Sequence, residues 1–304
     1  MEQFNVIVLG APAAGGSRTP VASFTDNSDI QGNAFINGSV AGSTFAGNGL
    51  PSGSTIGLEA TGGITSSSVQ VNKGNVLIGG TATGGFSVNR GGSLVQNSTA
   101  PVSDLANFSS ELSATSTAWA ALPTTNGATV TASKNDLSFN VPTGPSLVVF
   151  NINSTTFSPG QPISNIDFSN LSTNQQVLVN FSGSSFSEPG GLNFNGNADL
   201  ADNIVWNFST AATVSLQSGW YGSILAPNAA LDTQSTITGN VAVGGITGVG
   251  EIDFASPNFS TPLNAIPAGG PLPAPPTGAL LFCGVLGLGG LALCRRKPAD
   301  KYLA

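Results

Sequence analysis

Short apolar runs bounded by glycine and asparagine recur along most of the chain. They occupy residues 32–38, 74–80 and 239–245, and a degenerate copy lies at 196–200. In each complete copy a Gly-Asn pair precedes three apolar residues, and another glycine follows within two positions. Because asparagine and glycine tolerate left-handed backbone conformations, each copy predicts a very short strand that ends in tight corners.

Strands this short cannot bury their own apolar side chains, so burial requires neighbouring copies to stack on one another. The pattern therefore predicts a mainly β fold of the β-solenoid (β-helix) type, in which Ile36, Ile78 and Val243 point inward. The spacing between copies is irregular, which leaves a β-sandwich as the alternative fold.

One segment departs from this pattern and follows the period of a helix. Its apolar residues share one face of a 3.6-residue repeat and are Leu105, Phe108, Leu112, Trp119 and Leu122. Ser103 or Asp104 offers an N-cap, and Pro123 ends the run. We therefore predict one amphipathic α-helix over about 103–122, packed along the β body with a purely structural role.

The balance of charges narrows the range of partners. Charged residues make up 8% of the 304 residues, against about 25% in ordinary soluble domains. Mean hydropathy is +0.19, too high for a chain that has little to bury. Of the 15 acidic residues 14 precede residue 271, together with only four of the eight basic residues. An acidic, lysine-poor body disfavours nucleic acid as a partner, because nucleic acid binding rewards clustered Lys and Arg.

The residue types present exclude several kinds of chemistry. The chain has no histidine, and its two cysteines, Cys283 and Cys294, lie near the C-terminus. Nucleophile–histidine catalysis and zinc sites of the usual kind are therefore excluded from the body. Carboxylate pairs of the glycosidase type remain as candidates, namely Asp199 with Asp202 and Glu251 with Asp253. Solvated turns or strand faces explain these pairs more simply, so we expect no catalytic residues.

Neither a metal site nor a cofactor site is predicted. Residues 26–29 and 199–203 are rich in oxygen ligands but lack a complete calcium-loop signature. Trp206, Trp220 and Tyr221 could stack on sugars, yet large aromatic residues in stacked coils more often belong to the core.

The C-terminal segment has three consecutive parts with different properties. A proline motif, Pro271-Leu272-Pro273-Ala274-Pro275-Pro276, precedes an uncharged apolar run, and the cluster Arg295-Arg296-Lys297 follows it. The apolar run is at the short end of what spans a bilayer, and clustered cations mark its cytoplasmic end. We therefore predict an ectodomain at 1–262, a linker with the proline motif at 263–276, a transmembrane helix at 277–294 and a basic cytoplasmic tail at 295–304.

This order of parts resembles the PEP-CTERM sorting signal of Gram-negative bacteria, in its Pro-Leu-Pro-Ala variant. Ala274 stands where that signal usually has glutamate. The resemblance implies processing by an exosortase, a transient stay in the inner membrane through 277–294, and delivery to the cell surface or matrix. A plain membrane anchor is the alternative.

No signal peptide is visible at the start, since Met1-Glu2-Gln3 runs into an apolar stretch too short for one. We therefore expect the natural precursor to begin upstream, the alternative being a tail-anchored cytoplasmic protein.

The body resembles the choice-of-anchor A domain of bacterial surface proteins. The segments that carry the likeness are 4–10, the Gly-Asn strands and above all 222–229, Gly-Ser-Ile-Leu-Ala-Pro-Asn-Ala, followed by 239–241. The resemblance covers nearly all of residues 4–260. It implies a right-handed β-solenoid with one accompanying helix, an adhesin's role, and no catalytic residues. Related folds bind ice through flat threonine arrays, but only the fragment 81–83 has a Thr-x-Thr pattern.

The function we expect is therefore that of an exported, non-enzymatic adhesin in the exopolysaccharide layer. Two alternatives remain open: a polysaccharide-acting β-helix enzyme that uses paired carboxylates, and a structural coat protein without a specific ligand.

Overall fold

Parallel pairing of short strands builds the body of the protein. The structure, a computed structural model, describes residues 4–254 apart from 48, 51–52, 134, 155, 157–162 and 196–197, with the backbone alone at 26–27 and 198–200. Within the described residues, antiparallel pairing between named strands joins only β12 to β13 and β2 to β3. The expected stack of parallel strands is therefore confirmed, and the alternative of two face-packed antiparallel sheets is wrong.

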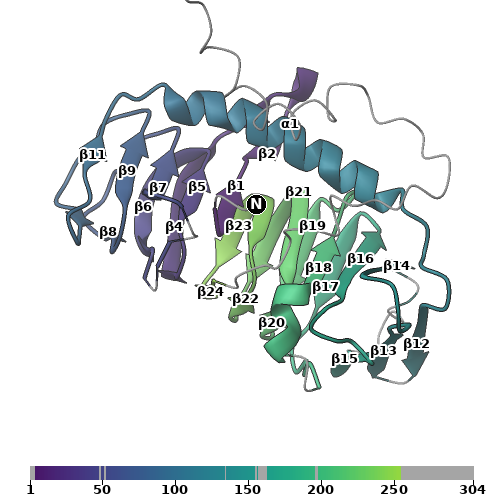
Figure 1. The fold of residues 1–304 in the computed structure, drawn as a ribbon. Helices are drawn as coiled ribbons and strands as arrows, with labels where there is room; N and C mark the ends of the chain where they lie inside the picture. The colour runs from purple at the N-terminus through teal and green to yellow at the C-terminus, as the bar shows by residue number, and fades with distance from the viewer. Residues whose placement is uncertain are drawn as a thin grey trace, which may run out of the picture. The chain divides into compact units, whose positions relative to one another are not determined.

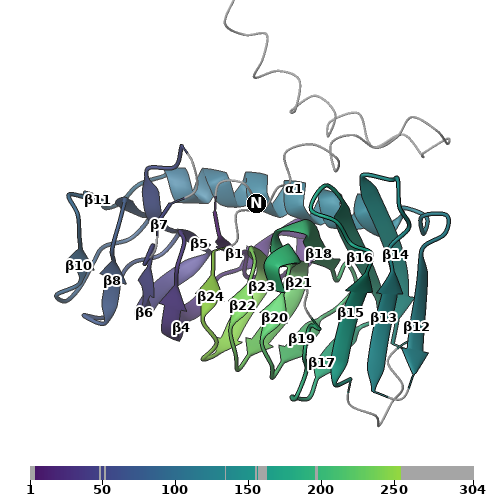
Figure 2. The same ribbon diagram turned by 60° about the horizontal axis from the view of Figure 1, so that its bottom comes forward.

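The strands form two long sheets and two small ones (Figures 1 and 2). The first sheet has the order β11 (Leu94–Val95), β9 (Asn75–Ile78), β7 (Ile56–Ala60), β5 (Ala34–Ile36), β1 (Val6–Val8), β23 (Val241–Gly248), β21 (Ser223–Thr233), β18 (Ile204–Asn207), β16 (Gln176–Ser182) and β14 (Leu147–Asn153), and β19 (Thr213–Leu216) and β17 (Ser185–Glu188) extend it beside β21. The second sheet has the order β10 (Ser87–Val88), β8 (Val69–Val71), β6 (Gly38–Phe45), β4 (Val21–Ile30), β24 (Ile252–Asp253), β22 (Ile237–Thr238) and β20 (Trp220–Tyr221). The small sheets are β12 (Thr129–Ser133), β13 (Asp136–Asn140) and β15 (Asn165–Ser169), and the hairpin β2 (Ala11–Pro12) with β3 (Arg18–Thr19). Short 3-10 turns lie at Ala14–Gly16 and Ala198–Asn203.

The chain does not run from one end of the stack to the other. Strand β1 lies in the middle of the first sheet, between β5 and β23 (Figure 1). From there the chain builds outward to β11, returns along the first sheet as helix α1, and builds inward from β14 until β23 meets β1. The strands of the first sheet that come first and last in the chain, β1 and β23, therefore pair with each other, and this pairing joins the two halves of the stack.

Asparagines of the recurrent Gly-Asn motif form hydrogen-bonded corners. The side chain of Asn5 donates to Asn240 Oδ1 at 3.0 Å, and the backbone N–H of Asn5 donates to Asn33 Oδ1 at 3.1 Å. All three asparagines are buried, so these bonds satisfy polar groups that would otherwise destabilise the core. A Cβ at Gly32 would lie only 2.5 Å from Cβ of Asn5, which explains why glycine precedes the asparagine. The copy at 74–80 has Asn75 at the equivalent corner, where its Oδ1 accepts from the N–H of Ser93.

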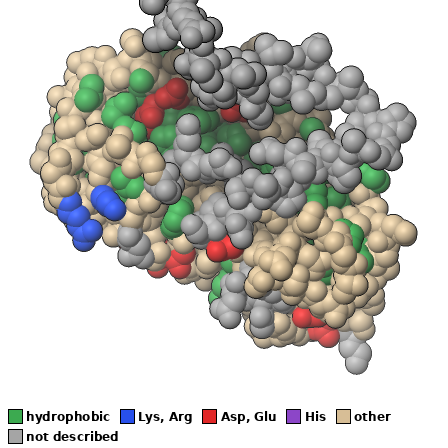
Figure 3. Space-filling model, viewed as in Figure 1, with side chains coloured by type: hydrophobic (Ala, Val, Ile, Leu, Met, Phe, Trp, Pro, Cys, Tyr) green, Lys and Arg blue, Asp and Glu red, His purple; other side chains and the backbone are tan. Residues whose placement is uncertain are grey.

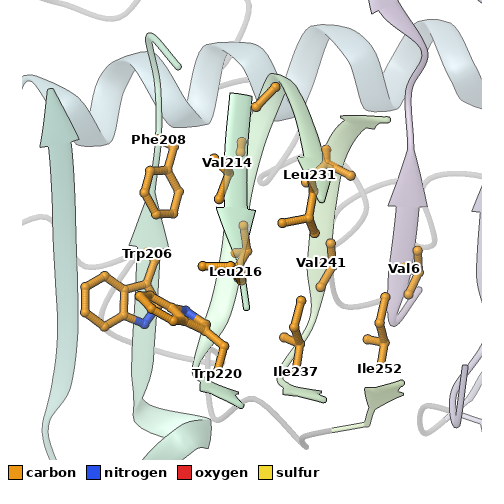
Figure 4. Close-up of a cluster of buried hydrophobic side chains, with 14 of the residues drawn as sticks. Val6, Trp206, Phe208, Val214, Leu216, Trp220, Leu231, Ile237, Val241 and Ile252 are labelled. Carbon is orange, nitrogen blue, oxygen red and sulfur yellow. The ribbon is translucent and has the colours of Figure 1, made fainter. Parts of the chain in front are cut away.

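The interior between the sheets is filled by side chains that alternate with outward-facing ones. Ile36, Ile78 and Val243 are fully buried in this core, as predicted. Figure 4 shows Trp206 and Trp220 among the core side chains of β18–β24, and both are at most 1% exposed. The two tryptophans therefore serve the core and are not available to stack on sugars.

Helix α1 (Ala100–Ala120) lies along the outer side of the first sheet (Figures 1 and 2). It begins three residues earlier than predicted, because Pro101 occupies the first turn, where a missing N–H costs no hydrogen bond. Thr99 holds the N-cap position without a side-chain cap, so the predicted caps Ser103 and Asp104 are wrong. The helix ends at Ala120, two residues before the predicted end, and Leu112 is buried at 6% exposure, as predicted.

One row of outward residues on the first sheet faces this helix. In the order of pairing, the row is Val95, Leu77, Glu59, Phe35, Ile7, Ala242, Leu225, Asn207, Asn180 and Asn151. Its middle is apolar and packs with the apolar face of α1. Its last three members, which we name the helix ladder, hydrogen-bond to the C-terminal half of the helix and to the residues that follow it.

No helix among the described residues has the length and apolar character needed to cross a bilayer. The predicted transmembrane helix at 277–294 lies outside the described residues, as do the sorting-signal residues Pro271 to Pro275 and Arg295 to Lys297.

Candidate functional site

An array of small residues, most of them with polar side chains, covers the outer side of four neighbouring strand segments. The array consists of the row Ser185, Thr213, Ala230 and Gly245 and the row Ser187, Ser215, Asp232 and Thr247. We name these two rows the hydroxyl face. Within the first row Ser185, Thr213 and Ala230 are exposed, and within the second Ser187 and Thr247 are exposed. These residues lie on β17, β19 and the C-terminal parts of β21 and β23.

Strand alternation produces this face. Between the two outer rows lies an inward row of Phe186, Val214, Leu231 and Ile246, which packs in or against the core. Neighbouring parallel strands lie about 4.8 Å apart, and outward residues on one strand repeat about every 6.7 Å. The hydroxyl groups therefore stand on a two-dimensional lattice that short side chains keep nearly flat.

Charge is sparse on this array. Asp232 is the one ionisable member of its two rows, and its Oδ1 accepts a hydrogen bond from Gln234 Nε2 at 2.8 Å. Charged side chains are also few on the side of the molecule that Figure 3 shows. A surface of this kind offers neutral donors and acceptors in place of electrostatic attraction.

A buried carboxylate fixes one edge of the hydroxyl face. Glu188, at the end of β17, is 3% exposed. Its oxygens accept hydrogen bonds from the backbone N–H groups of Gly190, Gln217 and Ser218, at 2.6, 3.0 and 2.8 Å. These bonds tie the turn after β17 to the turn after β19, so the two neighbouring strands of the face are held in register.

The predicted pair Glu251 and Asp253 comes together beside the second sheet, and Asp29 of β4 joins it. Burial, together with the charge of Glu251 and a hydrogen bond to it, raises the pKa of Asp253 to about 6. Burial and the same neighbour raise the pKa of Asp29. Gln31 Nε2 donates to Glu251 Oε1 at 2.9 Å. Sequence reasoning missed Asp29, because it is far from residue 251 in the chain and only the β4–β24 pairing brings it near.

The structure adds little evidence that Asp199 and Asp202 form a catalytic pair or that the candidate segments bind calcium. Burial raises the pKa of Asp202, but the side chain of its partner Asp199 is outside the described part. Across the described residues, no group of three or more His, Cys, Asp or Glu side chains could hold a metal ion. The side chains of 26–27 and 199–200 lie outside the described part, so this finding does not extend to the two candidate calcium segments.

The Thr-x-Thr fragment at 81–83 is less isolated than its sequence suggests. Its central residue Ala82 pairs with Ile64, which pairs in turn with Val40. Thr83 and Thr65 are therefore neighbours on adjacent coils, and both are exposed. The row ends at Ala41, so it offers two threonines and not a long array.

Serine and threonine are common throughout the chain, so their presence alone does not mark the hydroxyl face. Only the register between strands shows which of them share a surface. A period-two alternation of small polar and apolar residues at 185–187 and 213–216 is the signal that could have indicated it.

Comparisons with known proteins give one family and one similar structure. The chain is similar to the crystal structure of an ice-binding protein from the Antarctic ascomycete Antarctomyces psychrotrophicus, with 15% sequence identity and a TM-score of 0.26 over 82% of this chain and 99% of that chain. None of the curated proteins matches the chain. A family model described as "Putative Ice-binding-like adhesive domain" matches residues 1–254, which include every residue that the structure describes.

Proposed function

Because the chain belongs to the family described as "Putative Ice-binding-like adhesive domain", we propose that it is a non-enzymatic adhesin on a right-handed β-solenoid scaffold. It would act at the surface or in the extracellular matrix of a Gram-negative bacterium. The observation that carries this proposal beyond the family is the hydroxyl face, a regular, nearly uncharged array on four neighbouring strand segments.

A neutral polysaccharide is the ligand class that this face fits best. Its repeating hydroxyl groups can exchange hydrogen bonds with serine and threonine at many points along one chain. Each contact is weak, because protein–water hydrogen bonds are lost when it forms. Many such contacts on one polymer add up to useful avidity. Exopolysaccharide is therefore the partner we propose.

Arginine at the centre of the hydroxyl face is expected to weaken binding to neutral exopolysaccharide at least tenfold. Thr213→Arg and Ser187→Arg each place a long charged side chain on the flat array and hold a polymer away from it. The measurement is binding of the full chain to a glycan array and to isolated exopolysaccharide. Ser87→Arg is the matched control, because Ser87 is exposed on β10, outside the two rows.

Three results of this experiment would contradict the proposal. If all three variants bind the polysaccharide equally well, the hydroxyl face does not contact it. If the unmodified chain binds no polysaccharide, the alternative of a structural coat protein is favoured. If Thr213→Arg and Ser187→Arg abolish freezing-point hysteresis of the unmodified chain and leave glycan binding unchanged, the hydroxyl face binds ice.

A polysaccharide-acting enzyme is the second candidate, and the carboxylates beside β24 are the observation in its favour. Asp253, with a pKa raised to about 6, can hold a proton in mildly acidic solution beside Glu251. This is the arrangement that a general acid requires. Glycan turnover that disappears in Glu251→Gln would establish this activity in place of simple adhesion.

We also propose that the C-terminal segment delivers the protein by exosortase-type sorting. The proline motif at 271–276, the apolar run and the basic cluster at 295–297 support it. Cleavage is expected near Pro273–Thr277, which would remove the predicted helix at 277–294 and release the body from the inner membrane.

Replacing Arg295, Arg296 and Lys297 together with serine is expected to impair membrane retention and processing, since the cations hold the helix in the bilayer. Ala274→Glu is the matched control and should be tolerated. The test needs a precursor with an export signal in an exosortase-bearing host. Mass spectrometry that finds the intact tail on the mature surface protein would leave only the plain anchor.

A further inference from the structure

A glutamate lies buried between the first sheet and the N-terminal half of α1. Glu59 belongs to the row that faces the helix, between Leu77 of β9 and Phe35 of β5. Its side chain is only 3% exposed, although its neighbours in the row are apolar. Leu58 and Ala60, on either side of it in β7, point into the core, so strand alternation forces Glu59 toward the helix.

The partner of this glutamate is another carboxyl group. The side chain of Asp104 on α1 lies within hydrogen-bonding reach of Glu59. One of its oxygens, Glu59 Oε1, is buried, and no donor of the described residues hydrogen-bonds to it. Two carboxyl groups can share a hydrogen bond only if one of them carries a proton, because ionised carboxylates are acceptors only.

Among the residues that the structure describes, no cation faces this pair. Strands β5 and β9 contribute Phe35 and Leu77, and the charged group that α1 contributes is Asp104. The next acid of the helix, Glu111, is exposed. Arg18 binds Ser109 and Ser113 farther along the helix, at 2.9 Å each. Burial, with the hydrogen bond and charge of Asp104, raises the pKa of Glu59 to about 8.

We propose that the proton shared by Glu59 and Asp104 is a latch that holds the N-terminal half of α1 on the sheet. Loss of the proton would leave two adjacent carboxylates in an apolar interface, and the helix would have to move to let water reach them. The C-terminal half would stay in place, because the helix ladder and Arg18 hold it by neutral or permanently charged groups.

The direction of the pH effect follows from the raised pKa. A docked helix binds the proton more tightly than a released one, so low pH favours docking. The stabilisation is complete below about 4.5, the ordinary pKa of glutamate, and is lost as the pH rises through about 8. Release would uncover Phe35 and the helix residues Leu105 and Phe108 that now pack near it. The protein would then present apolar surface only at alkaline pH.

Hydrogen exchange of the full chain between pH 6 and pH 9.5 tests this latch. Protection factors of residues 100–108, corrected for the intrinsic pH dependence of exchange, are expected to fall at least tenfold above pH 8. Those of residues 113–120 should stay constant. Glu59→Gln should abolish the pH dependence, because its amide donates to Asp104 without a titrating proton.

Two further variants make the outcome decisive. Asp104→Asn should abolish the pH dependence as Glu59→Gln does, and it serves in place of Glu59→Gln if that variant fails to fold. Asp232→Asn, a change on the hydroxyl face, is the control. Its protection at residues 100–108 should depend on pH as in the unmodified chain. Constant protection of residues 100–108 across the pH range in the unmodified chain would overturn the proposal. An unchanged pH-dependent loss in both carboxamide variants would overturn it as well.

Discussion

Replacing Asn207 with alanine is expected to lower the free energy of unfolding by about 2–4 kcal/mol. The side chain of Asn207 is fully buried, accepts from Ser116 Oγ at 2.6 Å and donates to the carbonyl of Ser116 at 2.9 Å. It also donates to Asn180 Oδ1 at 2.9 Å. Its removal would leave several polar groups unpaired inside the helix–sheet interface, where water cannot replace the missing bonds.

The measurement is urea unfolding followed by tryptophan fluorescence, since two tryptophans are buried in the core. Asn151→Ala is the matched control. Asn151 belongs to the same helix ladder and donates to the carbonyl of Leu122 at 2.9 Å, but it is exposed. Water can therefore satisfy its partners, and we expect a cost below about 1 kcal/mol. Equal costs for the two variants would show that the ladder does not act through buried hydrogen bonds.

Leu112→Ala is expected to cost about 2–5 kcal/mol, as truncation of a buried leucine usually does. Leu112 is 6% exposed and packs with Phe35 and Leu225 of the row beneath the helix. Alanine would leave a cavity at the middle of α1, where it crosses the junction of the two halves of the stack. The same unfolding experiment measures the loss.

Val102→Ala provides the comparison for this helix. Val102 lies on the same helix at 59% exposure, and surface truncations of this kind change stability by at most about 0.5 kcal/mol. A change for Leu112→Ala as small as that for Val102→Ala would mean that the helix contributes little to the stability of the sheet.

The two predictions concern a helix whose ends are held differently. Its C-terminal half rests on the neutral helix ladder, and its N-terminal half rests on the pair Glu59 and Asp104. Titration can therefore affect one half and leave the other unchanged. Asn207→Ala in the helix ladder should therefore lower stability at every pH. Glu59→Gln should instead change how the docking of the helix depends on pH.

The central position of β1 places a demand on folding. Val6 pairs with Ala34 on one side and with Val241 on the other. The second pairing cannot form until almost the whole described part of the chain is present. Contacts between residues so distant in the chain are slow to form, because a long loop must close first.

The sequence by itself determined the features that depend on neighbours in the chain. Gly32-Asn33 and Gly239-Asn240 indicated strand corners because turn chemistry is local, and both asparagines lie at such corners. The period of Leu105, Phe108 and Leu112 indicated the helix and its buried face for the same reason. The start of the helix was predicted too late, because the interpretation relied on polar caps. The proline at position 101 also indicates a helix start.

Only the tertiary structure decided which distant residues are neighbours. The insertion of β1 between β5 and β23, the approach of Asp29 to Glu251 and Asp253, and the contact of Glu59 with Asp104 all depend on strand register or on helix docking. The rows of the hydroxyl face depend on register too, since a shift of one residue would turn Thr213 and Ser215 inward and Val214 outward. Register is set by the packing of the whole stack, so no segment carries that information alone.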